Sequence, residues 1–247
     1  SIDVALTHWC VSLQEDYLLL SARLPETGDK EDLFIAFRKT SHLWSTPKSL
    51  GMRINSLYRE ASVYLAPDNH SLYFASDRPG GLDLYLSQRL DDSWTNWSNP
   101  LNLGPIVNSE ADESQICISE TNETAYFTVK APGIPAQIYQ AEIPPNAQPA
   151  RMFLCTGKVY QARTDGSLAA ELCIYSIEKG EANPLYCGIR TDATGRFLLL
   201  IPQGKTVGIY ARKTGFLSAG YHVVPGGIWE EEEDQEIELL GELMRRE

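Results

Sequence analysis

The sequence predicts an all-β protein in which a repeated set of short strands is followed by a small β-sandwich. Three observations carry this prediction. A motif recurs 53 residues later in the chain, short apolar runs alternate with turns rich in glycine and proline without a helical period, and the pattern changes after a proline-rich link at residues 144–149. A length of 247 residues is enough for one to two such domains.

The repeat is clearest in a motif that begins with tryptophan. Residues 44–56 and 97–109 align without a gap as W-S-x-P-x-x-L-G-x-x-[IV]-N-S, and the register continues into Glu60 and Glu113, which each precede an apolar run. We expect the tryptophans to pack between adjacent sheets, the glycines to allow a turn or a close backbone approach, and the asparagines to hydrogen-bond the local backbone. The residues concerned are Trp44 and Trp97, Gly51 and Gly104, and Asn55 and Asn108.

A pair of strands precedes each tryptophan, and a third pair follows without the tryptophan motif. The clearest pair is separated by a Pro-Gly-Gly turn at residues 79–81, which is typical of a hairpin. The three pairs are residues 17–21 with 32–36, 71–76 with 83–87, and 125–128 with 137–140.

About four short strands in about 50 residues are typical of a β-propeller blade. Residues 1–149 therefore predict a partial β-propeller of about three blades. Because a propeller typically needs about 4–8 blades to hide its sheet edges, we expect an incomplete ring. Further blades that precede Ser1 or come from another chain would complete it, and an open arrangement of three sheets is the alternative.

The turns and the tryptophan motif resemble a known family, the periplasmic WD-like β-propeller repeats of the TolB type. The matching residues are Ala66-Pro67-Asp68-Asn69-His70, Ser71 to Ser76, Asp77-Arg78-Pro79-Gly80-Gly81, Asp83-Leu84-Tyr85, and Trp97-Ser98, Pro100 and Leu103-Gly104. The resemblance implies a periplasmic propeller domain.

Residues 150–224 predict the β-sandwich, because six or seven short strands there are joined by turns that contain glycine. Strands are expected at residues 153–160, 172–176 and 206–211, a turn and a strand at residues 191–200, and Gly204-Lys205-Thr206 is interpreted as a hairpin turn. This region resembles the carboxypeptidase regulatory-like domain, a transthyretin-like sandwich. The matching residues are Gly157-Lys158-Val159, Asp192 to Phe197, Pro202 to Lys205 and Lys213 to Phe216.

That family pattern contains no catalytic residue, so Asp192 and Gly195 are interpreted as turn formers. Residues 225–247 are expected to form an acidic tail or linker, because residues 230–234 are five consecutive acidic residues and such a block repels itself. Residues 237–243 predict one more strand.

Charge and missing motifs exclude several classes of function. The chain has 21 Lys+Arg against 33 Asp+Glu and a formal net charge of −12, so it lacks the cationic surface that nucleic-acid binding needs. No apolar run approaches the ~18–20 residues of a membrane-spanning helix. A serine nucleophile elbow, a phosphate-binding loop and sialidase boxes are all missing from the sequence, so we nominate no catalytic residue and expect no enzymatic activity.

Cysteine and histidine do not occur at metal-ligand spacing, so no metal site and no cofactor are expected. Five cysteines are an odd number, which leaves at least one thiol free or paired between molecules. These residues are Cys10, Cys117, Cys155, Cys173 and Cys187, and His8, His42, His70 and His222.

The order of the two domains resembles Bacteroidota cell-envelope proteins of the OmpA family, which include a component of the type IX secretion system. The resemblance implies a non-enzymatic periplasmic scaffold, associated with the outer membrane, that connects envelope proteins to the cell wall; peptidoglycan would be bound by a domain outside this chain. Two alternatives remain. One is a glycan or peptidoglycan-fragment binding module, for which Trp94 is the tryptophan we nominate, and the other is the non-catalytic part of a propeller hydrolase.

Overall fold

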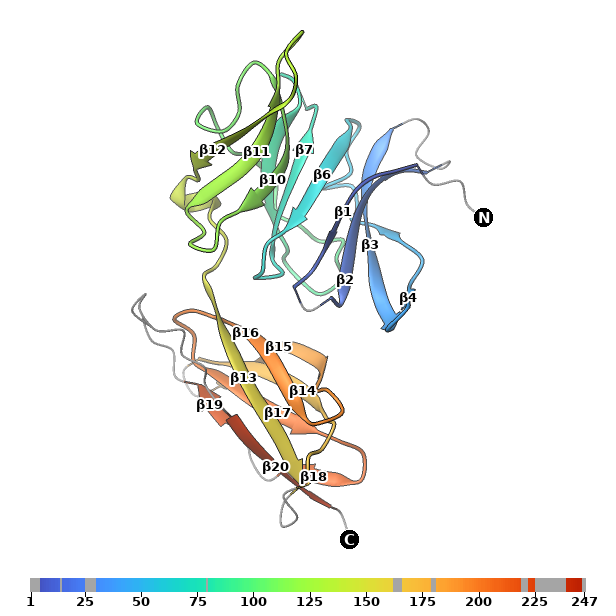
Figure 1. Ribbon diagram of the computed structural model, residues 1–247, viewed down its shortest axis with the longest axis vertical. Helices are drawn as coiled ribbons and strands as arrows, with labels where there is room; N and C mark the ends of the chain where they lie inside the picture. Colours follow the sequence, from blue (N-terminus) through green and yellow to red (C-terminus); the bar gives the residue numbers. More distant parts are fainter. Residues whose placement is uncertain are drawn as a thin grey trace. The chain divides into compact units, whose positions relative to one another are not determined.

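The computed structural model describes residues 5–13, 15–24, 30–78, 80–161, 166–178, 181–218, 222–224 and 239–245. In these residues the chain consists of β-strands, one 3₁₀ turn, η2 (Pro145–Ala147), and no α-helix, as Figure 1 shows. The all-β prediction is therefore confirmed. The chain divides into two compact units, Ser1–Ala150 and Arg151–Glu247.

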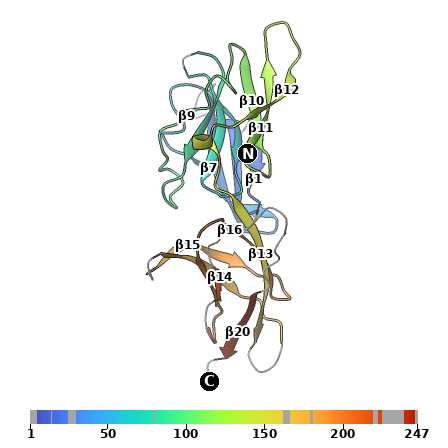
Figure 2. The same ribbon diagram turned by 90° about the vertical axis from the view of Figure 1, so that its left-hand side faces the viewer.

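The described part of the first unit contains three antiparallel sheets that follow one another along the chain, seen from two sides in Figure 1 and Figure 2. The first sheet consists of β1 (Ala5–Val11), β2 (Tyr17–Arg23), β3 (Glu31–Thr40) and β4 (Leu43–Trp44), with β5 (Lys48–Ser49) also paired to β3. The second sheet consists of β6 (Glu60–Leu65), β7 (Ser71–Ser76), β8 (Asp83–Gln88) and β9 (Leu101–Asn102). The third sheet consists of β10 (Asp112–Ile118), β11 (Thr124–Lys130) and β12 (Gln137–Glu142).

Each predicted strand pair forms an antiparallel ladder, β2 with β3, β7 with β8 and β11 with β12. The turn between β6 and β7 depends on Asp68, whose Oδ1 accepts hydrogen bonds from the backbone N–H groups of His70 and Ser71. Asn69 follows at a φ of 55°, which asparagine tolerates better than most residues. The Pro-Asp turn of the sequence is thus a structural element that joins two strands.

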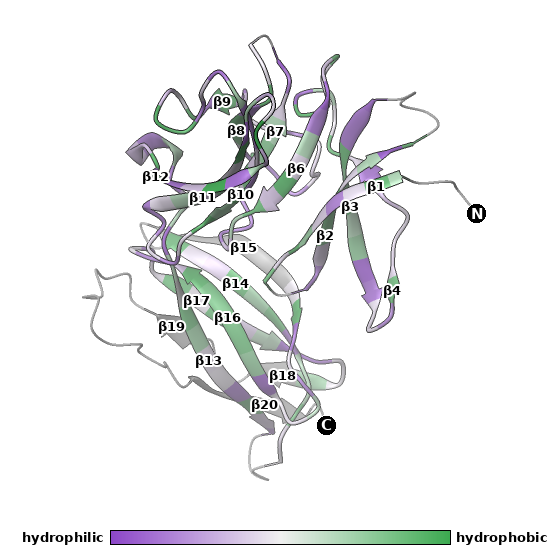
Figure 3. Cartoon of the chain, turned by 45° about the horizontal axis from the view of Figure 1, so that its top comes forward, coloured by the Kyte–Doolittle hydropathy of each residue, from purple (hydrophilic) through white to green (hydrophobic). Residues whose placement is uncertain are grey.

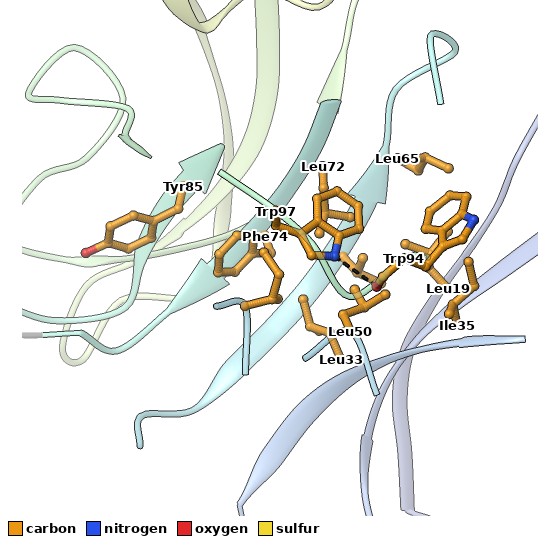
Figure 4. Packing of buried hydrophobic residues seen from close by; sticks show 12 residues of the cluster. Leu19, Leu33, Ile35, Leu50, Leu65, Leu72, Phe74, Tyr85, Trp94 and Trp97 are labelled. Atoms are coloured by element: carbon orange, nitrogen blue, oxygen red, sulfur yellow. Dashed lines mark hydrogen bonds between the residues drawn. The ribbon is translucent and has the colours of Figure 1, made fainter. Parts of the chain in front are cut away.

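Two hydrophobic cores hold the three sheets together. The core between the first and second sheets contains Leu19, Leu33 and Ile35 from one side and Leu72 and Phe74 from the other, as Figure 4 shows. The core between the second and third sheets contains Tyr73, Leu84 and Leu86 together with Ile116 and Phe127. The second sheet is therefore buried on both faces, which explains why every residue of β7 is buried.

In the second unit, the described residues form two four-stranded sheets. One has the order β16 (Arg196–Pro202), β13 (Met152–Gln161), β20 (Leu239–Arg245) and β18 (Phe216–Ser218). The other has the order β15 (Glu181–Arg190), β14 (Glu171–Glu178), β17 (Val207–Arg212) and β19 (His222–Val224). One core joins them, with Val159 and Leu199 from the first sheet and Ile174 and Ile209 from the second; the hydrophobic residues of β16 are green in Figure 3.

Asp192 and Gly195 form the turn that precedes β16, as the sequence suggests. Asp192 Oδ1 accepts hydrogen bonds from the backbone N–H groups of Thr194 and Arg196. Gly195 has a φ of 79°, and a Cβ there would lie 2.5 Å from the carbonyl oxygen of Val159. Only glycine fits this position.

The interpretation of Gly204-Lys205-Thr206 as a hairpin turn is wrong. The turn joins β16 to β17, but β16 pairs with β13 and β17 pairs with β14 and β19, so the chain crosses here from one sheet to the other. Farther on, the acidic run at residues 230–234 lies outside the described residues. β20 overlaps the strand expected at residues 237–243 and runs parallel to β13.

Candidate functional site

The asparagine of each motif copy lies in the loop that follows a sheet, and its side chain hydrogen-bonds to a strand of that sheet. The Asn55 side chain accepts a hydrogen bond from the N–H of Leu33 at 2.9 Å and donates one to its C=O at 2.8 Å. Asn108 binds the N–H and C=O of Leu84 at 2.9 and 3.0 Å in the same way. The amides therefore bind backbone, but on a strand more than 20 residues earlier, so the expectation of local bonding is wrong.

The two motif copies end in a segment that we call the interface loop, residues 50–56 in the first copy and 103–109 in the second. Leu50 and Ile54 are completely buried between the first and second sheets. In the second copy, Leu103 and Val107 lie between the second and third sheets. Each interface loop therefore fills the space between its own sheet and the next one along the chain.

The tryptophans of the two copies differ in burial. Trp97 is 2% exposed and lies in the core between the first and second sheets, as predicted, and its indole N–H donates to the carbonyl oxygen of Trp94 at 3.0 Å (Figure 4). Trp44 is only half-buried and belongs to none of the described hydrophobic cores. The prediction that Trp44 packs between sheets is wrong, because its register partner Arg38 lies on the face of β3 opposite Leu33 and Ile35.

The nomination of Trp94 for glycan binding is also wrong. Trp94 is 3% exposed, so no sugar reaches its ring. The Arg89 guanidinium lies 4.5 Å from the ring centroid, the Tyr17 ring lies 4.6 Å away, and Phe37 packs edge-on. Trp94 thus joins the first and second sheets.

Two buried carboxylates lie at the border between the first and second sheets. Glu31 accepts hydrogen bonds from Ser21, Thr7 and the Arg59 guanidinium. Burial alone would raise the pKa of Glu31, but these three donors outweigh burial and the pKa is lowered. For Glu60 burial dominates and the pKa is raised, despite the Ser56 hydroxyl and the charges of Lys30 and Arg78.

The histidines and cysteines named in the sequence analysis do not form a cluster. Among the described residues no group of three or more His, Cys, Asp or Glu side chains could hold a metal ion. His8 lies in β1, His42 in the turn before β4, and His222 in β19. His70 Nδ1 lies 3.3 Å from a terminal nitrogen of the Arg89 guanidinium. In the described part of the chain no helix is long and apolar enough to cross a membrane.

The cysteines divide into thiols and a disulfide. Cys10, Cys117 and Cys155 are thiols, and burial raises the pKa of Cys155 to about 11. Cys173 is disulfide-bonded, and Cys187 is the residue opposite it across β14 and β15.

The candidate site is the uncovered face of the first sheet, which we call the open face. Its residues are register partners, Trp9 with Leu20, Val11 with Leu18, Leu6 with Ala22 and Leu20 with Phe34. Leu19, Leu33 and Ile35 point to the other face, toward the second sheet. Trp9 is 59% exposed and Leu6 50%, Val11, Leu18 and Leu20 are half-buried, and Phe34 is buried.

Sequence reasoning missed the open face because the predicted strand pairs begin at residue 17 and place Trp9 in no sheet. A signal was nevertheless present in residues 17–20, which form a continuous apolar run, Tyr-Leu-Leu-Leu. Such a run is typical of a strand that is covered on both faces. The described structure covers only one face of β2.

Comparison with known proteins gives no assignment. No family model and no curated protein matches the chain. Among solved structures, the group B streptococcus pilus 2b backbone protein has a TM-score of 0.32 and 12% identity, with 98% of this chain and 97% of that chain covered. The Pseudomonas aeruginosa periplasmic gluconolactonase has a TM-score of 0.35 and 12% identity, with coverage of 90% and 70%. The Bacillus anthracis TIE protein has a TM-score of 0.29 and 11% identity, with coverage of 93% and 43%.

Proposed function

We propose that the chain is a non-enzymatic interaction scaffold of the cell envelope that binds other envelope proteins in the periplasm, near the outer membrane. In its finer form, the proposal is that three blades of a TolB-type β-propeller are followed by a carboxypeptidase regulatory-like sandwich. Such a protein would link outer-membrane or type IX secretion machinery to the cell wall. A rigid stack of sheets suits this role, because paired strands fix the positions of the surfaces that bind.

The open face is the single observation that carries the proposal. Large apolar residues that lie together on a soluble surface mark an interaction site, whereas apolar residues scattered singly need no explanation. Trp9, Leu6 and the partly covered Val11, Leu18 and Leu20 lie together on two neighbouring strands. Tryptophan is also enriched among the residues that dominate protein–protein binding energy.

The disulfide of Cys173 supports the proposed compartment. Disulfides persist in oxidising compartments such as the bacterial periplasm and are rare in the cytosol. A thiol probe that labels Cys173 in protein isolated without reduction would contradict a periplasmic location.

A photo-crosslinking amino acid placed at position 9 tests the proposal in cells that produce the protein. We expect covalent adducts with another protein from position 9 and none from position 138. Ile138 is the matched control, because it is an exposed apolar residue, 81% accessible, on the third sheet. Equal adducts from both positions, or none from position 9, would contradict the proposal.

Binding to glycans is the second candidate, favoured only by the exposure of Trp9, since an exposed indole stacks on a sugar ring. The neighbours of Trp9 on the open face are aliphatic, however, and sugar hydroxyls need polar partners. Sedimentation of the purified chain with murein sacculi, lost on Trp9→Ala, would favour the glycan candidate. Turnover of generic esters or glycosides would instead favour a hydrolase.

A further inference from the structure

The two hydrogen-bonded asparagines give a residue-by-residue equivalence between the first and second sheets. Because Asn55 binds Leu33 and Asn108 binds Leu84, those leucines are equivalent. Following the strand registers from this pair gives the positions that correspond to the open face. The equivalent pairs are Trp9 and Val63, Val11 and Leu65, Leu18 and Leu72, Leu20 and Phe74, and Phe34 and Tyr85.

In the second sheet all five equivalent positions are buried. The exposures of Val63, Leu65, Leu72, Phe74 and Tyr85 are 0%, 4%, 0%, 0% and 8%. The residues that cover them come from the inner side of the first sheet and from its interface loop, notably Leu50 and Ile54. The open face therefore has the same arrangement of apolar positions as a face that a sheet of this repeat is known to cover.

We propose that the occupant of the open face is one more β-sheet of this same repeat, which presents an interface loop of the form L-G-x-x-[IV]-N-S. This inference names the partner of the surface on which the proposed function rests. It follows from continuity with two existing interfaces, because Leu50 with Ile54 and Leu103 with Val107 fill equivalent positions at both.

The third sheet does not supply this partner surface. Four positions of the second sheet face the third sheet, and each corresponds by register to a position on the outer side of the third sheet. The equivalent pairs are Tyr73 and Tyr126, Ala75 and Thr128, Leu84 and Ile138, and Leu86 and Gln140. No interface loop follows β12; instead Ile143 and Ala147 turn back into the core between the second and third sheets. The outer side of the third sheet therefore has polar residues, Thr128 and Gln140, at two of these four positions, and it lacks the interface loop that the occupant of the open face must present.

A second copy of this chain fits the open face less well than a repeat sheet. The interface loop of the first sheet is already buried against the second sheet, and that of the second sheet against the third. Two open faces pressed together would therefore have no interface loop between them.

A fusion protein tests the inference directly. A copy of residues 57–109, which contains the second sheet and its interface loop, is placed ahead of Ser1 in the full chain. The matched control carries Leu103→Ser and Val107→Ser in the added copy only. Oxidation of Trp9 by N-bromosuccinimide is read by mass spectrometry, and the peptide with Trp9 is distinct from those with Trp94 and Trp97.

We expect Trp9 oxidation in the fusion to fall to the level of buried Trp97, and to stay high in the control. We also expect the thermal unfolding midpoint of the first unit to rise in the fusion, because each stacked repeat adds an interface. A folded fusion with Trp9 still reactive would overturn the inference, while adducts from position 9 in cells would leave the proposed function intact. Concentration-dependent dimers of the unfused chain that protect Trp9 would also overturn it, in favour of a second copy.

If the fusion does not fold, the inference is tested instead by the sequence of the peptide that is photo-cross-linked to position 9. The inference requires that the cross-linked partner peptide belong to a strand or interface loop of a repeat containing L-G-x-x-[IV]-N. A partner peptide from any other type of sequence would overturn it.

Discussion

Trp97 and Trp44 begin two copies of one motif, yet Trp97 is buried between two sheets and Trp44 is half-exposed. The same contrast extends to the sheets that carry them, since Phe74 is fully buried and its equivalent Leu20 is not. The difference is not in the residue types, which are large and apolar in both copies. The difference lies in the neighbouring sheet, because the first sheet covers this face of the second sheet, whereas no described sheet covers the equivalent face of the first.

Replacing the two tryptophans gives the largest expected contrast. Trp97→Ala removes a side chain from the core between the first and second sheets and should cost about 3–5 kcal/mol of unfolding free energy. Trp44→Ala should cost about 1 kcal/mol or less, since its side chain already meets solvent. Urea unfolding of both variants measures the difference, and equal losses would break the comparison.

The glycines of the interface loops give the next contrast. Gly51 and Gly104 have φ values of 86° and 78°, so alanine at either position costs about 1–2 kcal/mol from backbone conformation alone. A Cβ at Gly51 would also lie 2.9 Å from the carbonyl oxygen of Thr95, whereas at Gly104 nothing lies within 4 Å. Gly51→Ala should therefore lower the urea midpoint more than Gly104→Ala, and the reverse order would show that the close approach is absent.

The asparagines should behave alike, which sharpens the comparison. Asn55→Ala and Asn108→Ala each leave the N–H and C=O of one strand residue without their side-chain partner. Each substitution should cost about 1–3 kcal/mol of unfolding free energy. If Asn55→Ala alone were harmless, the first interface loop would not be fastened as the second is, and the equivalence of the two sheets would fail.

The smallest expected effects are in the dependence of stability on pH. The pKa of Glu31 is lowered in the folded chain. The contribution of Glu31 to the free energy of unfolding is therefore present above the ordinary carboxyl pKa of about 4.3 and is lost as the pH falls below that value. The pKa of Glu60 is raised. The contribution of Glu60 to the free energy of unfolding is therefore present at acid pH and is lost as the pH rises through the raised pKa.

Glutamine variants separate the two carboxylates. Between pH 7 and pH 3, Glu31→Gln should lose less stability than the unsubstituted chain, and Glu60→Gln should lose more. Thermal unfolding across this range measures both slopes. Identical slopes for the two variants would mean that the donors around Glu31 do not distinguish it from Glu60.

Sequence reasoning could predict the β class, the strand pairs of the first unit and the conformations of Gly51 and Gly195, because each depends on local residue pattern. It could not predict the partners of Asn55 and Asn108, because those hydrogen bonds join residues more than 20 positions apart. In the second unit it missed that the turn at residues 204–206 crosses between sheets, since a turn motif does not specify which strands pair.

The candidate site was harder to predict than the fold. Trp94 looked available because it lies outside the repeated motif, but Arg89 and Tyr17 enclose its ring. Among the described tryptophans Trp9 is the most exposed, and its position on the face opposite Leu19 depends on the register of β1 and on the irregularity between Leu6 and His8. That irregularity leaves no pattern in the sequence that we recognised.

Hydroxyl-radical footprinting of Trp9 most directly tests whether the open face binds a partner. Trp9 oxidation is compared between the purified chain and the same protein in intact cells, with Tyr126 and Tyr139 on the third sheet as internal references. The account predicts strong oxidation of Trp9 in the purified chain and protection in cells, with unchanged reference tyrosines. Equal oxidation of Trp9 in both settings would contradict it.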